Sequence, residues 1–147
     1  MNESCGLENT GQNSLLRTLL GAAQRAEGRV ESALAGIGLS LAKLSVLNHL
    51  VQAGEMLPLG QLAGRLSCVK SNMTQLVDRL ETDGLVVRVA DPADRRSVRA
   101  AITDEGRRRH ADGTRILEEQ EIQLVEAFST GEREQFVGFL HRLSGDY

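Results

Sequence analysis

Residues 62–107 read LAGRLSCVKSNMTQLVDRLETDGLVVRVADPADRRSVRAAITDEGR, and this stretch decides the fold. The apolar residues from Val69 to Leu80 recur at helical spacing, and Gly84 fits just past the end of that helix. Residues 85–89 and 97–102 are short β-branched runs joined by a seven-residue arm around Pro92. The pattern predicts two helices and then a β-hairpin.

The two helices have the spacing of a helix-turn-helix. Ala63 is small enough to let the helices cross closely, and Ser67 stands at the turn, where glycine is the usual residue. The predicted inward positions of the pair are Leu62, Leu66, Cys68, Met73 and Leu76. In such a motif the second helix enters the DNA major groove.

The outward face of the second helix suits contact with DNA. It consists of Lys70, Ser71, Asn72, Thr74, Gln75 and Arg79. Hydroxyls and amides bond base edges at close range, and basic side chains neutralise phosphates. The alternative is an ordinary solvated face, but such faces are rich in acids and residues 70–77 contain none. We therefore predict that this face reads the major groove.

The hairpin carries two arginines at its tip. A hairpin directly after a helix-turn-helix makes a winged helix, whose tip lies over the adjacent minor groove, where arginine is favoured. Arg95 and Arg96 are the predicted minor-groove contacts, and Asp91 and Asp94 would orient them by ion pairing or cap the turn. A solvated loop is the alternative.

Further helices flank this centre. Apolar periodicity predicts a helix from Ser14 that ends at Gly36 and Gly38, a second after Ser40, and a short third one with Pro58 in its first turn. A long helix capped by Thr103 runs to about Phe128, and the last begins at residue 130. The predicted fold is mainly α with a small β-hairpin wing: six helices, with helices from both termini flanking a winged helix-turn-helix.

Length and composition bound the class of protein. The 147 residues suit one domain, divided into a flexible tail (1–13), an N-terminal dimerisation helix (14–38), a winged DNA-binding part (39–103) and C-terminal dimerisation helices (104–147). The net charge is −3, but residues 61–110 carry ten basic and seven acidic side chains, so one face can be basic. Apolar runs are too short for a membrane span, the start is no secretory signal, and two cysteines fit a reducing cytoplasm.

The central stretch resembles the MarR family of bacterial transcriptional regulators. The matching parts are LVDRLE-x-x-GLV at the end of the recognition helix, DPADRRS in the wing and IT-x-E-G-R at the start of the next helix. The resemblance implies a homodimeric repressor or activator, joined through its first and last helices, on a pseudo-palindromic operator. Many relatives have a serine cap where Val69 stands, so either Ser67 caps the helix instead or the helix begins later.

The resemblance also implies regulation by an effector, such as a small phenolic or aromatic molecule, bound between the dimer helices and the winged part. His49 is the polar candidate for that site on the second helix. Redox sensing is a second possibility: Cys68 adjoins the recognition helix and Cys5 lies in the tail. His49, His110 and His141 lack metal-ligand spacing, so no metal or other cofactor is predicted.

An enzyme and a protein-binding adaptor are the two rival classes. An enzyme would carry a nucleophile elbow, a phosphate loop or a metalloprotease motif, and the sequence has none of them. A winged-helix adaptor that binds another protein is the stronger rival. Such an adaptor has no need of Arg95 and Arg96, so their presence favours DNA.

Overall fold

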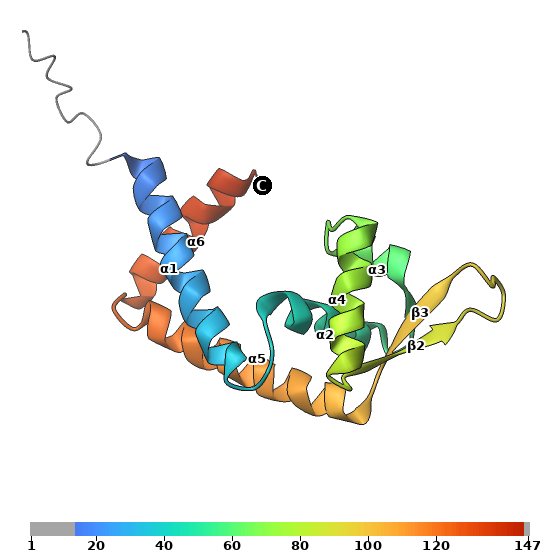
Figure 1. Cartoon of the computed structure of the whole chain (residues 1–147). Coiled ribbons are helices and arrows are strands. Elements are labelled where there is room, and N and C mark those ends of the chain that lie inside the picture. The colour runs from blue at the N-terminus through green and yellow to red at the C-terminus, as the bar shows by residue number, and fades with distance from the viewer. Residues whose placement is uncertain (1–13, 146–147) are drawn as a thin grey trace, which may run out of the picture.

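The computed structural model describes residues 14–145, which form six helices and a small sheet (Figure 1). The helices are α1 (Leu15–Ala35), α2 (Leu41–Ala53), α3 (Leu59–Arg65), α4 (Lys70–Thr82), α5 (Asp104–Val125) and α6 (Thr130–Ser144). The strands are β1 (Leu57–Pro58), β2 (Val86–Ala90) and β3 (Val98–Ile102). The predicted mainly helical fold with a hairpin wing is confirmed; the tail at 1–13 lies outside the described residues.

The sheet has one more strand than predicted. Its order is β1-β3-β2, all antiparallel, with Val86 opposite Ile102 and Ala90 opposite Val98. Pro58 was placed in the first turn of a helix, and that was wrong by one position: it pairs with Arg99 in β1, and α3 begins at Leu59. Proline tolerates such an edge position because it has no amide proton to leave unpaired.

The hydrophobic core lies almost entirely within the winged part. Buried apolar side chains come from α2, α3, α4 and the sheet, whereas α1 contributes only Leu34. The largest fully buried ones are Leu34, Val46, Leu47, Leu50, Leu62, Met73, Val77, Leu80, Leu85 and Val86. The winged part therefore has a core of its own.

The turn between α3 and α4 has the predicted form. Ser67 has φ of 49°, the left-handed conformation that glycine usually supplies. The Cys68 amide then donates to the Ala63 carbonyl at 2.9 Å. Cys68 packs partly buried against the core, but Val69, which was counted in the apolar periodicity of this helix, is 61% exposed. The helix begins at Lys70, so Val69 stands before the first turn and its side chain escapes the helical periodicity.

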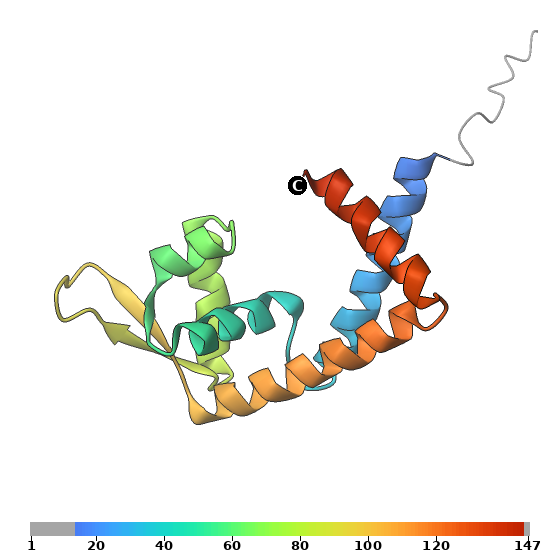
Figure 2. The ribbon, with the colours of Figure 1, turned by 180° about the vertical axis from the view of Figure 1, so that it is seen from behind.

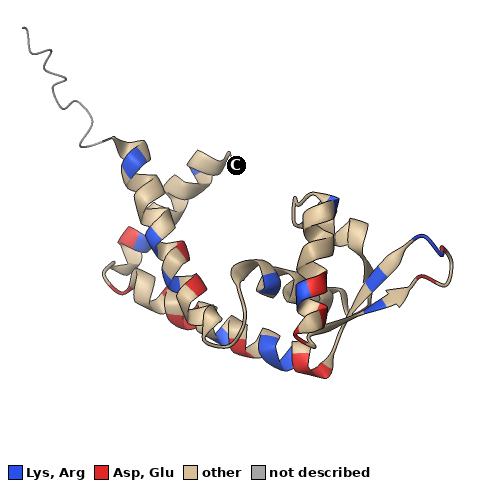
Figure 3. Cartoon of the chain, viewed as in Figure 1, with Lys and Arg blue, Asp and Glu red and all other residues tan. Residues whose placement is uncertain are grey.

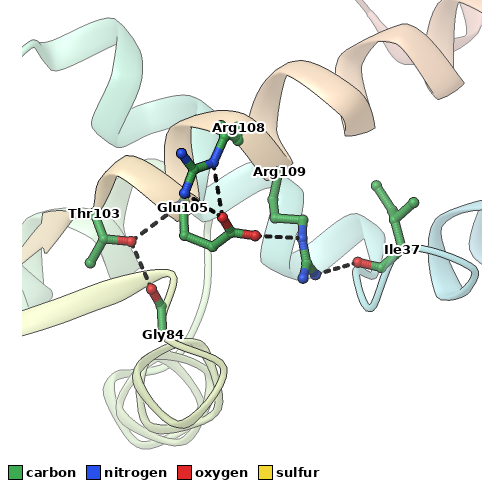
Figure 4. A network of polar contacts seen from close by, with 7 residues as sticks. Ile37, Gly84, Thr103, Glu105, Arg108 and Arg109 are labelled. Atoms are coloured by element: carbon green, nitrogen blue, oxygen red, sulfur yellow. Dashed lines mark hydrogen bonds and ion pairs between the residues drawn. The ribbon is translucent and has the colours of Figure 1, made fainter.

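The junction between wing and long helix is closed by Thr103 (Figure 4). Its hydroxyl donates to the Gly84 carbonyl at 2.7 Å and accepts from the Gly106 amide at 3.0 Å, which confirms the predicted cap. Gly106 lies so close to the segment between α4 and β2 that a Cβ there would stand 2.1 Å from the Leu85 carbonyl oxygen. The start of α5 is thus fixed against this segment.

A second contact ties α5 to the turn between α1 and α2. Arg109 donates to the Ile37 carbonyl at 2.6 Å and to Glu105 at 3.1 Å (Figure 4). Hydrogen bonds from Arg108, and then the charge of Arg109, lower the pKa of Glu105. One carboxylate therefore holds both arginines beside the helix junction.

The remaining helices form a separate lobe. Figures 1 and 2 show α1, the far end of α5 and α6 on one side, with the winged part at the near end of α5. The long helix ends at Val125 rather than near Phe128, and Ser129 and Glu132 form a capping box that starts α6. Phe128 and Phe136 stack across this turn at 5.9 Å between ring centroids. No residue of α6 is buried within the described chain.

Candidate nucleic-acid interface

The predicted face of α4 is open to solvent. All six of its residues are exposed: Lys70, Ser71, Asn72, Thr74, Gln75 and Arg79. The Thr74 hydroxyl donates to the Lys70 carbonyl at 3.1 Å, which leaves its oxygen as an acceptor toward solvent. The face offers amides, hydroxyls and cations, with no acid before Asp78.

The start of α4 differs from those of α2, α5 and α6. Those helices are capped by the side chains of Ser40, Thr103 and Ser129. At α4 the N-cap is Val69, and no side chain accepts from the first-turn amides. Neither alternative drawn from the sequence is found: Val69 itself holds the N-cap position without a side-chain cap, and Ser67 makes the turn.

The loop of the wing is built by its two aspartates. Asp91 is buried and accepts from the Ala93 amide and from Arg99 Nε, both at 3.0 Å, and these bonds lower its pKa. Asp94 accepts from the Arg96 amide at 3.0 Å. Both aspartates thus act on the loop backbone, and the ion pair of Asp91 is with Arg99. The Arg95 and Arg96 side chains are exposed.

A groove separates α4 from the wing. It is lined by Pro58, Leu59, Gly60, Lys70, Ser71, Thr74, Asp94, Arg96, Ser97 and Val98. Lys70 and Arg96 thus face the same groove from opposite sides, although 26 positions separate them in the sequence. In Figure 3 the wing carries basic residues on both strands and at the tip, with acidic ones confined to its loop. Such a groove accommodates a polyanionic strand.

One contact across this interface was missed by sequence reasoning. Arg88 on β2 contacts Asp78 and Glu81 of α4. The sequence holds no motif for it, because the partners come from a helix and a strand whose relative placement depends on the whole fold.

His49, the predicted effector residue, does not line the small hollow between α2 and α5. His49 is half-buried on α2, but a hollow of about 180 Å³ between α2 and α5 is lined by other residues: Leu41, Leu44, Ser45, Asn48, His110, Thr114 and Leu117. His110 Nε2 lies 3.1 Å from Asn48 Oδ1, and burial lowers the pKa of His110. Within residues 14–145 no group of three side chains is placed to hold a metal ion. Nor is any helix in that range long and apolar enough to cross a membrane.

Comparison with known proteins supports the resemblance drawn from the sequence. Residues 39–98 match the family model described as MarR family. The chain is 41% identical over 69 residues to the uncharacterized HTH-type transcriptional regulator YkoM of Bacillus subtilis, covering 47% of this chain and 44% of that protein. The matched region thus spans less than half the length of this curated relative.

Solved structures share the fold over most of the chain. CouR from Rhodococcus jostii RHA1, bound to p-coumaroyl-CoA, has 29% identity and a TM-score of 0.71, with 89% of this chain and 92% of that one covered. A mutant MarR from E. coli complexed with operator DNA has 20% identity and a TM-score of 0.75, with 88% and 92% covered. Residues 39–98 therefore resemble the MarR family, and the chain shares its winged-helix fold with these solved structures.

Proposed function

We propose that this protein is a sequence-specific transcriptional regulator that binds a pseudo-palindromic operator as a homodimer and acts as a repressor. The observation that carries the proposal is the groove between α4 and the wing, with Lys70 on one wall and Arg96 on the other. The exposed face of α4 enters the major groove and the wing tip reaches the adjoining minor groove. The operator-bound MarR structure supports this assignment through its fold.

The proposed dimer is supported by the apolar side chains that the lobe of terminal helices leaves exposed to solvent. Apolar side chains exposed there include Leu15, Leu16, Leu20, Ile122, Leu124, Phe136, Val137, Phe139 and Leu143. A patch of this kind on α1, α5 and α6 marks an interaction surface. Pairing across a two-fold axis covers it on both copies and sets two α4 helices at a fixed spacing.

We also propose release of DNA by a small phenolic or aromatic effector bound in the hollow between α2 and α5. The hollow is lined by aliphatic side chains with the polar pair His110 and Asn48. CouR, which shares the fold, is bound to p-coumaroyl-CoA. A ligand in this hollow would contact α5. Because the start of α5 is bonded to the segment before the wing, a shift of α5 would be passed to the wing.

Selection of random DNA duplexes by the wild-type protein tests the main proposal. We expect a two-fold symmetric site. Arg96→Ala should weaken every selected site by about 1–3 kcal/mol and reduce the salt dependence, whereas Gln75→Ala should change which sites are preferred. Arg115→Ala, an exposed arginine paired with Asp112 on α5, is the matched control and should change neither.

No enrichment over random DNA at moderate salt would reject the proposal. It would favour the rival function, a winged helix that binds another protein. Release of the selected duplex by p-coumaric acid would support the effector site, and unchanged binding would argue against a phenolic ligand.

A further inference from the structure

The wing and the recognition helix are joined by a set of contacts that converge on one residue, Arg88. Its guanidinium contacts Asp78 Oδ1 and donates to the Thr74 carbonyl at 3.2 Å. Its Nε lies 3.9 Å from Glu81 Oε2. All three partners belong to α4, so one strand residue holds two successive turns of the helix.

The contact is reciprocal. β2 is an edge strand, and an edge strand has backbone amides that its only neighbour leaves unpaired. The Arg88 amide is one of them, and it donates to Glu81 Oε1 at 3.1 Å. Both the side chain and the backbone amide of Arg88 thus donate hydrogen bonds to α4. We call Thr74, Asp78, Glu81 and Arg88 the α4–β2 clasp.

The clasp contributes little to folding stability in itself. The side chains of Arg88, Asp78 and Glu81 are 29%, 51% and 41% exposed, and ion pairs of that exposure are typically worth under about 1 kcal/mol. The direction of the contact is better defined than its energy. Arg88 Nη2 meets both the Asp78 carboxylate and the Thr74 carbonyl, whereas the buried Nε has no hydrogen-bond partner within the described residues.

The clasp also pairs the two acidic side chains of α4, Asp78 and Glu81, with the positive charge of Arg88. Asp78 and Glu81 are the first acids after the acid-free stretch 70–77, on the helix proposed to enter a polyanionic groove. Arg88 engages both of them at the wing side of α4. Arg79, which stands between them in sequence, remains exposed.

We propose that Arg88 is a positioning residue: it fixes the angle between α4 and the wing, so that the face of α4 and Arg96 engage adjoining grooves of DNA at the same time. This inference rests on the proposed DNA-binding function. It assigns the coupling between the two proposed DNA-contacting elements to a residue whose observed contacts are with α4.

A double-mutant cycle tests the proposal. Arg96→Ala is measured on the selected duplex in the wild-type protein and in Arg88→Met. If Arg88 positions the wing, Arg96→Ala should weaken binding about ten-fold or more in the wild type but about two-fold or less in Arg88→Met, because the wing is then already misplaced. Arg88→Lys should restore part of the coupling.

The control variant is Lys43→Met. It removes an ion pair of 2.7 Å between α2 and Asp83 near the end of α4, within the same winged part but away from the wing. It should leave the effect of Arg96→Ala unchanged. Equal effects of Arg96→Ala in wild type and Arg88→Met would overturn the proposal, since additivity means that Arg88 acts independently of the wing, for instance by binding phosphate itself.

A measurement without DNA separates failure of this proposal from failure of the proposed function. Spin labels at Gln75→Cys and Ala93→Cys, with both native cysteines replaced by serine, report the distance from α4 to the wing tip. Arg88→Met should broaden or shift that distance distribution, and Lys43→Met should not. An unchanged distribution would overturn the positioning role whether or not the protein binds DNA, whereas a changed one in a protein that binds no DNA would leave the clasp standing and reject only the regulator.

Discussion

The winged part and the terminal helices bury their apolar residues in different ways. The winged part encloses Leu47, Leu62 and Met73 completely within one chain. In the other lobe, which is helical throughout, Phe139 is 55% and Leu143 is 63% exposed. One lobe therefore folds around its own core, whereas the other exposes apolar side chains that the proposed dimer would cover.

Gly106→Ala should have the largest effect, and it acts on the lobe that has its own core. The new methyl would meet the Leu85 carbonyl at 2.1 Å and Ile102 Cγ1 at 2.8 Å. The Leu85 carbonyl belongs to the backbone and cannot move away without distorting the chain. The free energy of unfolding should therefore fall by about 3 kcal/mol or more. Urea denaturation measures it.

Gly64→Ala is the matched control, since nothing lies within 4 Å of its added methyl. Replacing glycine by alanine in a helix should leave stability unchanged or raise it by up to about 1 kcal/mol. If both variants had the same free energy of unfolding, Gly106 could not be as closely packed as described.

Polar substitution in the other lobe should act on association rather than on folding. Phe139→Ser and Leu143→Ser each remove apolar surface from the proposed dimer interface, so each should raise the dimer dissociation constant by about ten-fold, equivalent to about 1.4 kcal/mol. Sedimentation equilibrium measures this. Val87→Ser, at an exposed apolar residue of the wing, should leave self-association unchanged. A monomeric wild-type protein would refute the assignment of this lobe to dimerisation.

The smallest expected effect is on the pH dependence of stability, and it comes from His110, which lies between α2 and α5. Burial lowers its pKa in the folded state, so the unfolded chain binds the proton more readily. Stability should therefore decline as the pH falls through the ordinary histidine range near 6.5, and it should be insensitive to this group above it. Urea midpoints at pH 7.5 and 5.5 should differ less in His110→Gln than in the wild type. An equal difference in both proteins would assign the pH dependence to other groups.

Local signals in the sequence were sufficient for most of the fold. Thr103 with two acids after it predicted a helix start because a hydroxyl cap acts within three residues, and the structure has that bond. Ser67 was recognised as the turn residue from its spacing alone, and its positive φ confirms it. The strand β1 was missed, because a pair of residues opposite β3 leaves no periodicity to detect.

The candidate site was less predictable in detail. The exposure of the α4 face follows from helical periodicity, but that periodicity also included Val69, which is exposed because it stands one residue before the helix. The partners of Asp91 and Arg88 depend on how the hairpin folds back on itself and on α4, which composition does not specify. The roles of the α4 and wing residues in binding DNA remain predictions that the selection experiment tests.

The 22 residues of α5 form one continuous helix from the wing junction to the lobe of terminal helices. At a rise of 1.5 Å per residue it is a rod of about 33 Å. When one end of such a rod is held in the proposed dimer, a tilt of about 5° displaces the other end by about 3 Å, close to the rise of one base pair. In the proposed dimer on DNA, a tilt of this size in α5 shifts each α4 helix by about one base-pair step along the duplex.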